Sequence, residues 1–189
     1  MKNIAIFASG EGTNAQRIID YFKSSAKVKI ALIVSNKPTA NVLNRAKNVN
    51  IPTLIVSRDD FYKGDTTIKT LQAAHIDLIV LAGFLWMIPK NLIQAFPGKM
   101  VNIHPALLPK FGGKGMYGMH VHTAVVNAGE TESGISIHYV NEEYDEGKII
   151  AQHRCSLSKE DTPETVAAKI HELEYEFFPK VIEQLLLNN

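Results

Sequence analysis

The fold is indicated first by residues 3–14, which read NIAIFASGEGTN. Residues 3–8 are almost entirely apolar, which is typical of a strand buried in a parallel sheet, and the run ends at a glycine-rich turn over residues 9–12. Apolar side chains then recur at helical spacing, which predicts a helix over residues 14–23. The stretch therefore combines a strand, a glycine turn and a helix.

The same alternation of strand and helix continues along the chain. It predicts strands over residues 28–34, 53–56, 78–81 and 100–104, helices over residues 40–48 and 66–74, and a short helix after Pro89. Strands that alternate with helices in this way form a parallel sheet with helices on both faces. We therefore expect an α/β fold with a doubly wound, mostly parallel, Rossmann-like sheet.

The C-terminal part of the chain has a different pattern. Apolar and polar residues alternate over residues 135–139, which predicts a strand that exposes Ser136 and His138 on a solvated face. A second strand-like run covers residues 149–157, and a stripe of apolar residues beyond Thr162 predicts a long helix. We expect antiparallel strands towards the C-terminal half of the sheet and a long C-terminal helix.

The composition argues against several classes of protein. The 189 residues carry 20 Lys and Arg against 19 Asp and Glu, and these charges are scattered, so we expect no nucleic-acid partner. The single cysteine cannot form an internal disulfide, and no stretch approaches the length that spans a membrane. The N-terminus carries only a short apolar run, which does not resemble a signal peptide. We expect a cytoplasmic protein that is not bound to a membrane.

The glycine turn favours a phosphate ligand. Residues 9–14 lie where a strand is followed by a helix, and free backbone N–H groups and the helix dipole at such a junction attract an anion. The turn lacks the third glycine of a dinucleotide fingerprint, and residues 35–37, after the second strand, offer no acid for a ribose hydroxyl. A monophosphate is therefore favoured over a nicotinamide cofactor and over a purely structural turn.

Two polar residues end the strand over residues 100–104. Asn102 and His104 are two residues apart, so their side chains lie on the same side of the strand. Open α/β sheets place their ligands at the carboxyl ends of the strands, where this pair lies. Taken alone, His104 could also be a hydrogen-bonded histidine of the core.

The residues around this pair resemble a known family. Residues 102–110 read NIHPALLPK and are similar to the Asn-Ile-His-Pro-(small)-Leu-Leu-Pro motif of folate-dependent formyltransferases. The stretches 9–14, 81–84 and 145–147 match further motifs of that family in the same order, so the resemblance extends over essentially the whole chain. It is greatest to the members that act on glycinamide ribonucleotide, and it implies a single formyltransferase domain over residues 1–189.

The resemblance implies an activity and three catalytic residues. The formyl group of the co-substrate 10-formyltetrahydrofolate would be transferred to the amine of glycinamide ribonucleotide, a step of purine synthesis, by Asn102, His104 and Asp145. Attack of the amine on the formyl carbon develops an oxyanion and an ammonium. Asn102 could donate a hydrogen bond to the oxyanion, and a protonated His104 could donate a proton. We expect Asp145 to raise the pKa of His104 towards the working pH.

Further site residues follow from the same resemblance. The backbone N–H groups of Gly12, Thr13 and Asn14 would bind the ribonucleotide phosphate, and Glu174 would meet the amine end of that substrate, with a solvated helix acid as the alternative. The folate would contact Lys63, Leu85, Trp86, Met87, Ile88, Asn102, Asn141, Glu142, Glu143 and Tyr144. Trp86 stands where many relatives carry arginine, so its side chain is expected to pack differently against the folate tail.

Other expectations concern the glycine-rich residues 111–119 and the rival functions. This stretch predicts a mobile cover over the site. His104, His120, His122 and His138 lack the acids and cysteines of a compact zinc site, so no metal is expected. The small-molecule substrates would be the partners of a monomer or homodimer.

Three other functions compete with this interpretation: a formyl-tetrahydrofolate hydrolase, a formyltransferase acting on initiator tRNA and a non-catalytic phosphate-binding module. The first two usually carry a further domain that we do not expect here.

Overall fold

The computed structural model describes residues 1–187, which form one seven-stranded sheet in the order β3-β2-β1-β4-β5-β6-β7. The strands are β1 (Lys2–Phe7), β2 (Val28–Ser35), β3 (Thr53–Ile55), β4 (Leu78–Leu81), β5 (Met100–His104), β6 (Glu132–Tyr139) and β7 (Ile149–Ser156). The first five strands pair in parallel, while β6 pairs antiparallel with both β5 and β7. The predicted mixed, mostly parallel sheet is therefore confirmed.

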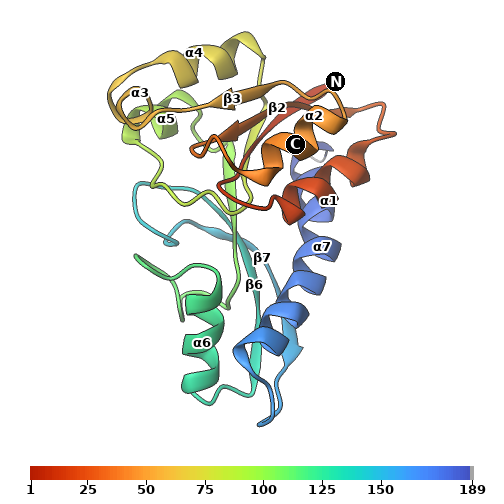
Figure 1. Ribbon diagram of the computed structural model, residues 1–189, viewed down its shortest axis with the longest axis vertical. Helices are drawn as coiled ribbons and strands as arrows, with labels where there is room; N and C mark the ends of the chain where they lie inside the picture. Colours follow the sequence, from red (N-terminus) through yellow and green to blue (C-terminus); the bar gives the residue numbers. More distant parts are fainter. Residues whose placement is uncertain (188–189) are drawn as a thin grey trace.

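The helices cover both faces of the sheet. They are α1 (Thr13–Phe22), α2 (Asn41–Asn48), α3 (Arg58–Lys63), α4 (Thr66–Ala73), α5 (Lys90–Ala95), α6 (Met119–Asn127) and the long C-terminal α7 (Pro163–Leu187). Figure 1 shows α1 and α7 side by side along one face, with α3, α4 and α5 on the other side of the sheet. None of these helices is long and apolar enough to cross a membrane.

Two hydrophobic clusters explain why β1 is almost continuously apolar. Ile4 and Ile6 pack into the cluster that also holds α1 and α7, while Ala5 and Phe7 pack into the cluster on the opposite face. A central strand covered by helices on both faces has no solvated side, so its sequence does not alternate. From β1 the strand order first extends to one side, through β2 to β3, and then to the other side, through β4 to β5. The order reverses beside β1, and in open α/β sheets this switch point leaves a crevice at the carboxyl ends of the strands.

The prediction that β6 exposes one face is wrong. Ser136 and His138 are both buried, although they alternate with apolar residues. The Ser136 hydroxyl donates to the carbonyl oxygen of Ala106 at 2.7 Å and accepts the N–H of Leu108 at 2.9 Å. The segment that follows β5 therefore covers this part of the polar face of β6, and Ser136 forms hydrogen bonds with its backbone.

Helices α3 and α6 are absent from the sequence prediction. α3 has only six residues, and its start depends on the Ser57 hydroxyl, which accepts the N–H of Asp60 at 3.3 Å. α6 begins directly after Gly118, and no side-chain hydrogen bond caps its N-terminus. α3 is too short for a helical period to be read from its sequence, although Ser57 caps it, and α6 lacks a side-chain cap that would mark where it begins after the glycine-rich loop.

Candidate active site

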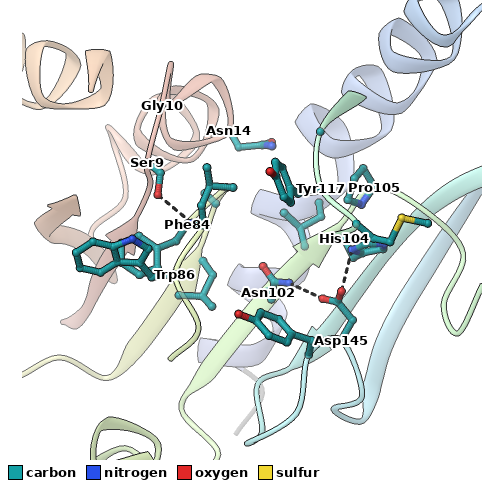
Figure 2. Close-up of a pocket in the computed structure, with 18 of the residues that line it drawn as sticks. Ser9, Gly10, Asn14, Phe84, Trp86, Asn102, His104, Pro105, Tyr117 and Asp145 are labelled. Atoms are coloured by element: carbon teal, nitrogen blue, oxygen red, sulfur yellow. Dashed lines mark hydrogen bonds and ion pairs between the residues drawn. The ribbon is translucent and has the colours of Figure 1, made fainter. Parts of the chain in front are cut away.

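A cavity of about 730 Å³ lies at the switch point of the sheet. It is lined by residues 9–14 after β1, 81–88 after β4, 102–105 at the end of β5, 113–118 before α6, parts of the loop after β6, and His171 and Glu174 of α7. Figure 2 shows Asn14 and Trp86 on one side of this space and Asn102, His104 and Asp145 on the other. The cavity is large enough for small-molecule substrates, which usually occupy clefts of roughly 300–1,000 Å³.

The glycine turn keeps its backbone N–H groups available. Gly12 precedes α1 with φ 70°, and no side chain caps this helix. A Cβ atom at Gly12 would lie 2.6 Å from the Val42 side chain, so only glycine fits. Gly12, Thr13 and Asn14 all line the cavity, as predicted for a phosphate site.

The structure brings Asn102, His104 and Asp145 together from two parts of the chain. An Oδ2 oxygen of Asp145 lies 3.4 Å from His104 Nδ1, and Oδ1 accepts a hydrogen bond from Asn102 Nδ2 at 3.4 Å. Asp145 has a positive φ of 56°, in the loop between β6 and β7. Figure 2 marks both contacts, so the predicted trio forms one polar cluster at the end of β5.

Both ring nitrogens of His104 face oxygen atoms. Nδ1 faces Asp145, and Nε2 lies 2.8 Å from the carbonyl oxygen of Phe111. Burial nevertheless lowers the pKa of His104, and the opposing effects of Asp145 and of the Phe111 carbonyl do not compensate for it. Asp145 therefore raises the pKa of His104, as expected, but the pKa still lies below its ordinary value, because the desolvation of a charged imidazolium outweighs the nearby carboxylate. The expectation of a His104 that is protonated at the working pH is wrong.

His138 is a member of the cluster that the sequence analysis did not assign to the site. It lies directly opposite Asn102 in the β5–β6 register, and its Nδ1–H donates to the carbonyl oxygen of Tyr139 at 2.9 Å. Its Nε2 lies 3.1 Å from Asn102 Nδ2 and 3.6 Å from Asp145 Oδ1. The two amide hydrogens of Asn102 are therefore already directed at His138 and Asp145. The sequence feature that could have indicated this role is the position of His138 on the polar side of a strand that neighbours β5.

The carboxyl group of Asp145 is held in its ionised form. Burial alone would raise its pKa, but contacts with His138, the charge of His104 and the backbone N–H of Gly113, at 3.0 Å from Oδ2, together lower it. A buried carboxylate that is already ionised and held by hydrogen-bond donors can stabilise a positive charge that develops on the neighbouring imidazole.

The predicted folate-contacting residues divide into two groups. Leu85, Trp86, Met87, Ile88, Asn141, Glu143 and Tyr144 line the cavity together with Asn102. Lys63 does not, because its side chain is 79% exposed and pairs with Asp59 at 2.9 Å. Glu142 also lies outside and pairs with Lys90 at 3.2 Å. The family resemblance indicates only the place of Lys63 along the chain, which does not fix where a flexible lysine side chain points.

An aromatic cluster supports the wall over residues 85–88. The Trp86 ring lies 5.6 Å from Phe61 and 5.9 Å from Tyr62, between ring centroids. The Ser9 hydroxyl accepts the N–H of Leu85 at 2.9 Å and donates to Asn36 Oδ1 at 2.6 Å. Ser9 thus connects the glycine turn to a wall whose apolar side chains suit a flat ring.

Glu174 is buried, so the alternative of a solvated helix acid is wrong. Its side chain is only 7% exposed, and Oε2 accepts hydrogen bonds from Asn14 Nδ2 at 2.9 Å and from His171 Nδ1 at 2.9 Å. The hydrogen bond to Glu174 raises the pKa of His171. Glu174 therefore lies beside the glycine turn and lines the same cavity.

Comparisons with known proteins show the family of the chain. A family model described as formyl transferase matches residues 2–182. The chain belongs to the formyl transferase family. The phosphoribosylglycinamide formyltransferase of Haemophilus influenzae is 40% identical over 188 residues, which cover 97% of this chain and 86% of the relative. The chloroplastic enzyme of that name from Arabidopsis thaliana is 38% identical over 187 residues, 96% of this chain, which spans 64% of the plant protein.

A solved structure has the same fold. Glycinamide ribonucleotide transformylase 1 from Geobacillus kaustophilus matches with a TM-score of 0.90 and 38% identity, covering 98% of this chain and 99% of that one. The chain is therefore a formyltransferase by family and by fold. A cytoplasmic location remains a prediction, since the plant relative is named chloroplastic.

The glycine-rich loop of this formyltransferase contacts the cluster of Asn102, His104 and Asp145 directly. Phe111 presents its carbonyl oxygen to His104, and Gly113 donates its N–H to Asp145. Residues 113–118 line the cavity, as expected for a cover. The mobility of this loop remains a prediction.

The histidines of the formyltransferase do not gather at one point. His104 and His138 contact Asp145, whereas His120 is exposed and packs against Tyr117, with 5.2 Å between the ring centroids. Among residues 1–187, no three His, Cys, Asp or Glu side chains are placed to hold a metal ion.

The buried histidines predict that stability falls in mild acid. Burial lowers the pKa of both His104 and His122, so the unfolded chain binds more protons than the native protein once the pH falls below about 6.5. His171 acts in the opposite direction, because its raised pKa adds stability at low pH that is lost as the pH rises. Burial lowers the pKa of His153 in the same way, and we expect the three lowered groups to dominate.

Urea unfolding between about pH 7.5 and pH 5.5 tests this. The midpoint is expected to move to lower urea as the pH falls, and the shift is expected to be smaller in His122→Leu. A midpoint that stays constant or rises on acidification would contradict the prediction.

Proposed function

We propose that this chain is a phosphoribosylglycinamide formyltransferase, a single domain over residues 1–189 that transfers the formyl group of 10-formyltetrahydrofolate to the amine of glycinamide ribonucleotide. The observation that carries the proposal is one cavity with an uncapped helix N-terminus at one end and the Asn102, His104 and Asp145 cluster at the other. An aromatic-backed apolar wall flanks the cluster. Relatives that bear this name support the choice of substrates.

The two substrates would occupy different parts of the cavity. The N–H groups of residues 12–14 would bind the phosphate, and Glu174 would contact the nucleotide on the way to its amine, as its hydrogen bond with Asn14 supports. The flat ring of the folate would lie against residues 85–88 and the lining residues of 141–144. The amine and the formyl carbon would then meet beside Asp145.

The lowered pKa of His104 changes the order of the proton steps. A neutral His104 can take the proton that the amine loses as its nitrogen bonds to the formyl carbon. The carboxylate of Asp145 then stabilises the imidazolium, which returns the proton to the folate nitrogen when its bond to the formyl carbon breaks. Asn102 would donate to the oxyanion by giving up its 3.4 Å contact with Asp145, the longer of its two contacts.

The activity is tested by mixing the purified protein with both substrates and following tetrahydrofolate release. Release that requires the amine substrate supports the transferase. Release without the amine would indicate a formyl-tetrahydrofolate hydrolase, and the absence of release in both mixtures would indicate a binding module without this activity.

The glycine turn yields a further prediction. Gly12→Ala is expected to raise KM for glycinamide ribonucleotide by about 10- to 100-fold, because the added Cβ collides with Val42 and displaces the N–H groups that face the phosphate. Steady-state kinetics with each substrate varied in turn measures this. Gly129→Ala is the matched control, since Gly129 has a similar φ of 66° with open space around it. Equal effects of the two substitutions would show that backbone strain alone is responsible.

A further inference from the structure

One nitrogen in the cavity has no use in the mechanism above. His122 of α6 lines the cavity and is only 2% exposed. Its Nδ1 atom is buried and has no hydrogen-bond partner. Asn14 Oδ1, on the same cavity wall as the phosphate site, is also buried and unpartnered. Buried polar atoms normally have partners, so two unpaired atoms on residues that line one cavity point to groups that gain a partner when a ligand binds and the neighbouring side chains adjust to it.

The position of His122 assigns it to the nucleotide half of the cavity. Its charge would interact with those of His171 and Glu174 on α7, and Glu174 is hydrogen-bonded to Asn14. The residues expected to meet the folate ring come instead from the loops after β4 and β6. His122 therefore lies near the part of the substrate that follows the phosphate.

The electrostatics of His122 suit an uncharged group. Burial and the nearby His171 and His104 lower its pKa, and Glu174 opposes them without reversing the result. The phosphate and the reacting amine already have partners, at the glycine turn and at the Asp145 cluster. What remains between them is the ribose and its amide link, which carry hydroxyl, N–H and carbonyl groups but no charge.

We infer that His122 is a substrate-binding residue whose Nδ1 forms a hydrogen bond with the uncharged ribosyl-amide part of the nucleotide. This inference rests on the proposed function, because it specifies which part of that substrate a buried side chain contacts. It gives α6 a role: the helix holds an imidazole against the nucleotide, between the glycine-rich loop and α7.

Two substitutions separate hydrogen bonding from packing. His122→Asn keeps an amide group at the position of Nδ1, whereas His122→Leu fills similar space without any polar atom. His122→Leu is expected to raise KM for glycinamide ribonucleotide about 3- to 10-fold, with kcat and the KM for the folate unchanged. His122→Asn is expected to restore most of the wild-type KM. His120→Leu, an exposed position on the same helix, serves as the matched control and is expected to behave as the wild type.

The outcomes separate the inference from the proposed function. A leucine variant with wild-type KM, or an asparagine variant worse than leucine, would show that His122 only fills space. Thermal unfolding checks that the variants fold; if the leucine variant does not, His122→Gln, which carries the amide one carbon further out, replaces it with the same expected rise in KM. No transfer by the wild type would overturn the proposed function, and this inference with it.

Discussion

Replacing His104 with alanine is expected to lower kcat by about 10²- to 10⁴-fold and to leave the KM of both substrates nearly unchanged. Burial lowers the pKa of His104, which favours its neutral form, and the Asp145 carboxylate lies 3.4 Å from its Nδ1. Without it, the proton released by the attacking amine has no base beside Asp145. Steady-state kinetics of tetrahydrofolate release measures the loss.

The pH profile adds a second test of His104. Because its pKa is lowered, the fraction of the neutral base falls only when the pH drops below the ordinary histidine range, so kcat is expected to decline on the acidic side. His153→Ala is the matched control, since His153 also has a lowered pKa but stacks on Phe177 outside the cavity. A His104→Ala enzyme with near wild-type kcat would exclude proton transfer through this imidazole.

The strands and the positions of Asn102 and His104 were predictable because their signals are local. A run such as residues 78–81 is apolar throughout, which only burial on both faces of a sheet explains. Asn102 and His104 end a central strand, and the order of strands in an open α/β sheet brings strand ends together. For Asp145, however, only the family resemblance predicted its role, since nothing in its own loop indicates contact with His104.

The errors arise where a property depends on distant parts of the chain. Ser136 and His138 resemble solvated residues because alternation records polarity, and it cannot reveal that the segment after β5 covers that face. The pKa of His104 depends on how deeply it is buried, which no sequence spacing records. The contact of Phe111 with His104 depends on the path of a glycine-rich loop, whose backbone has many conformations available.

Asp145→Asn is expected to reduce kcat by about 10²- to 10⁴-fold with little change in the shape of the site. The amide matches the carboxyl group in size and can still accept the N–H of Gly113 with its remaining oxygen. It carries no negative charge, so the imidazolium formed at His104 during proton transfer loses its counterion. Because Asp145 is one of the groups that raise the pKa of His104, the acidic decline of kcat is expected to move to lower pH in this variant.

Glu142→Gln tests whether charge at this loop matters in general or only at Asp145. Glu142 lies three residues earlier in the same loop, but it pairs with Lys90 outside the cavity, so its neutralisation is expected to leave both kcat and the pH profile unchanged. Kinetics and pH profiles of the two variants, measured side by side, make the comparison. An Asp145→Asn enzyme that retains the wild-type rate would mean that Asp145 only orders the loop, since its hydrogen bond to Gly113 survives the change while its charge beside His104 does not.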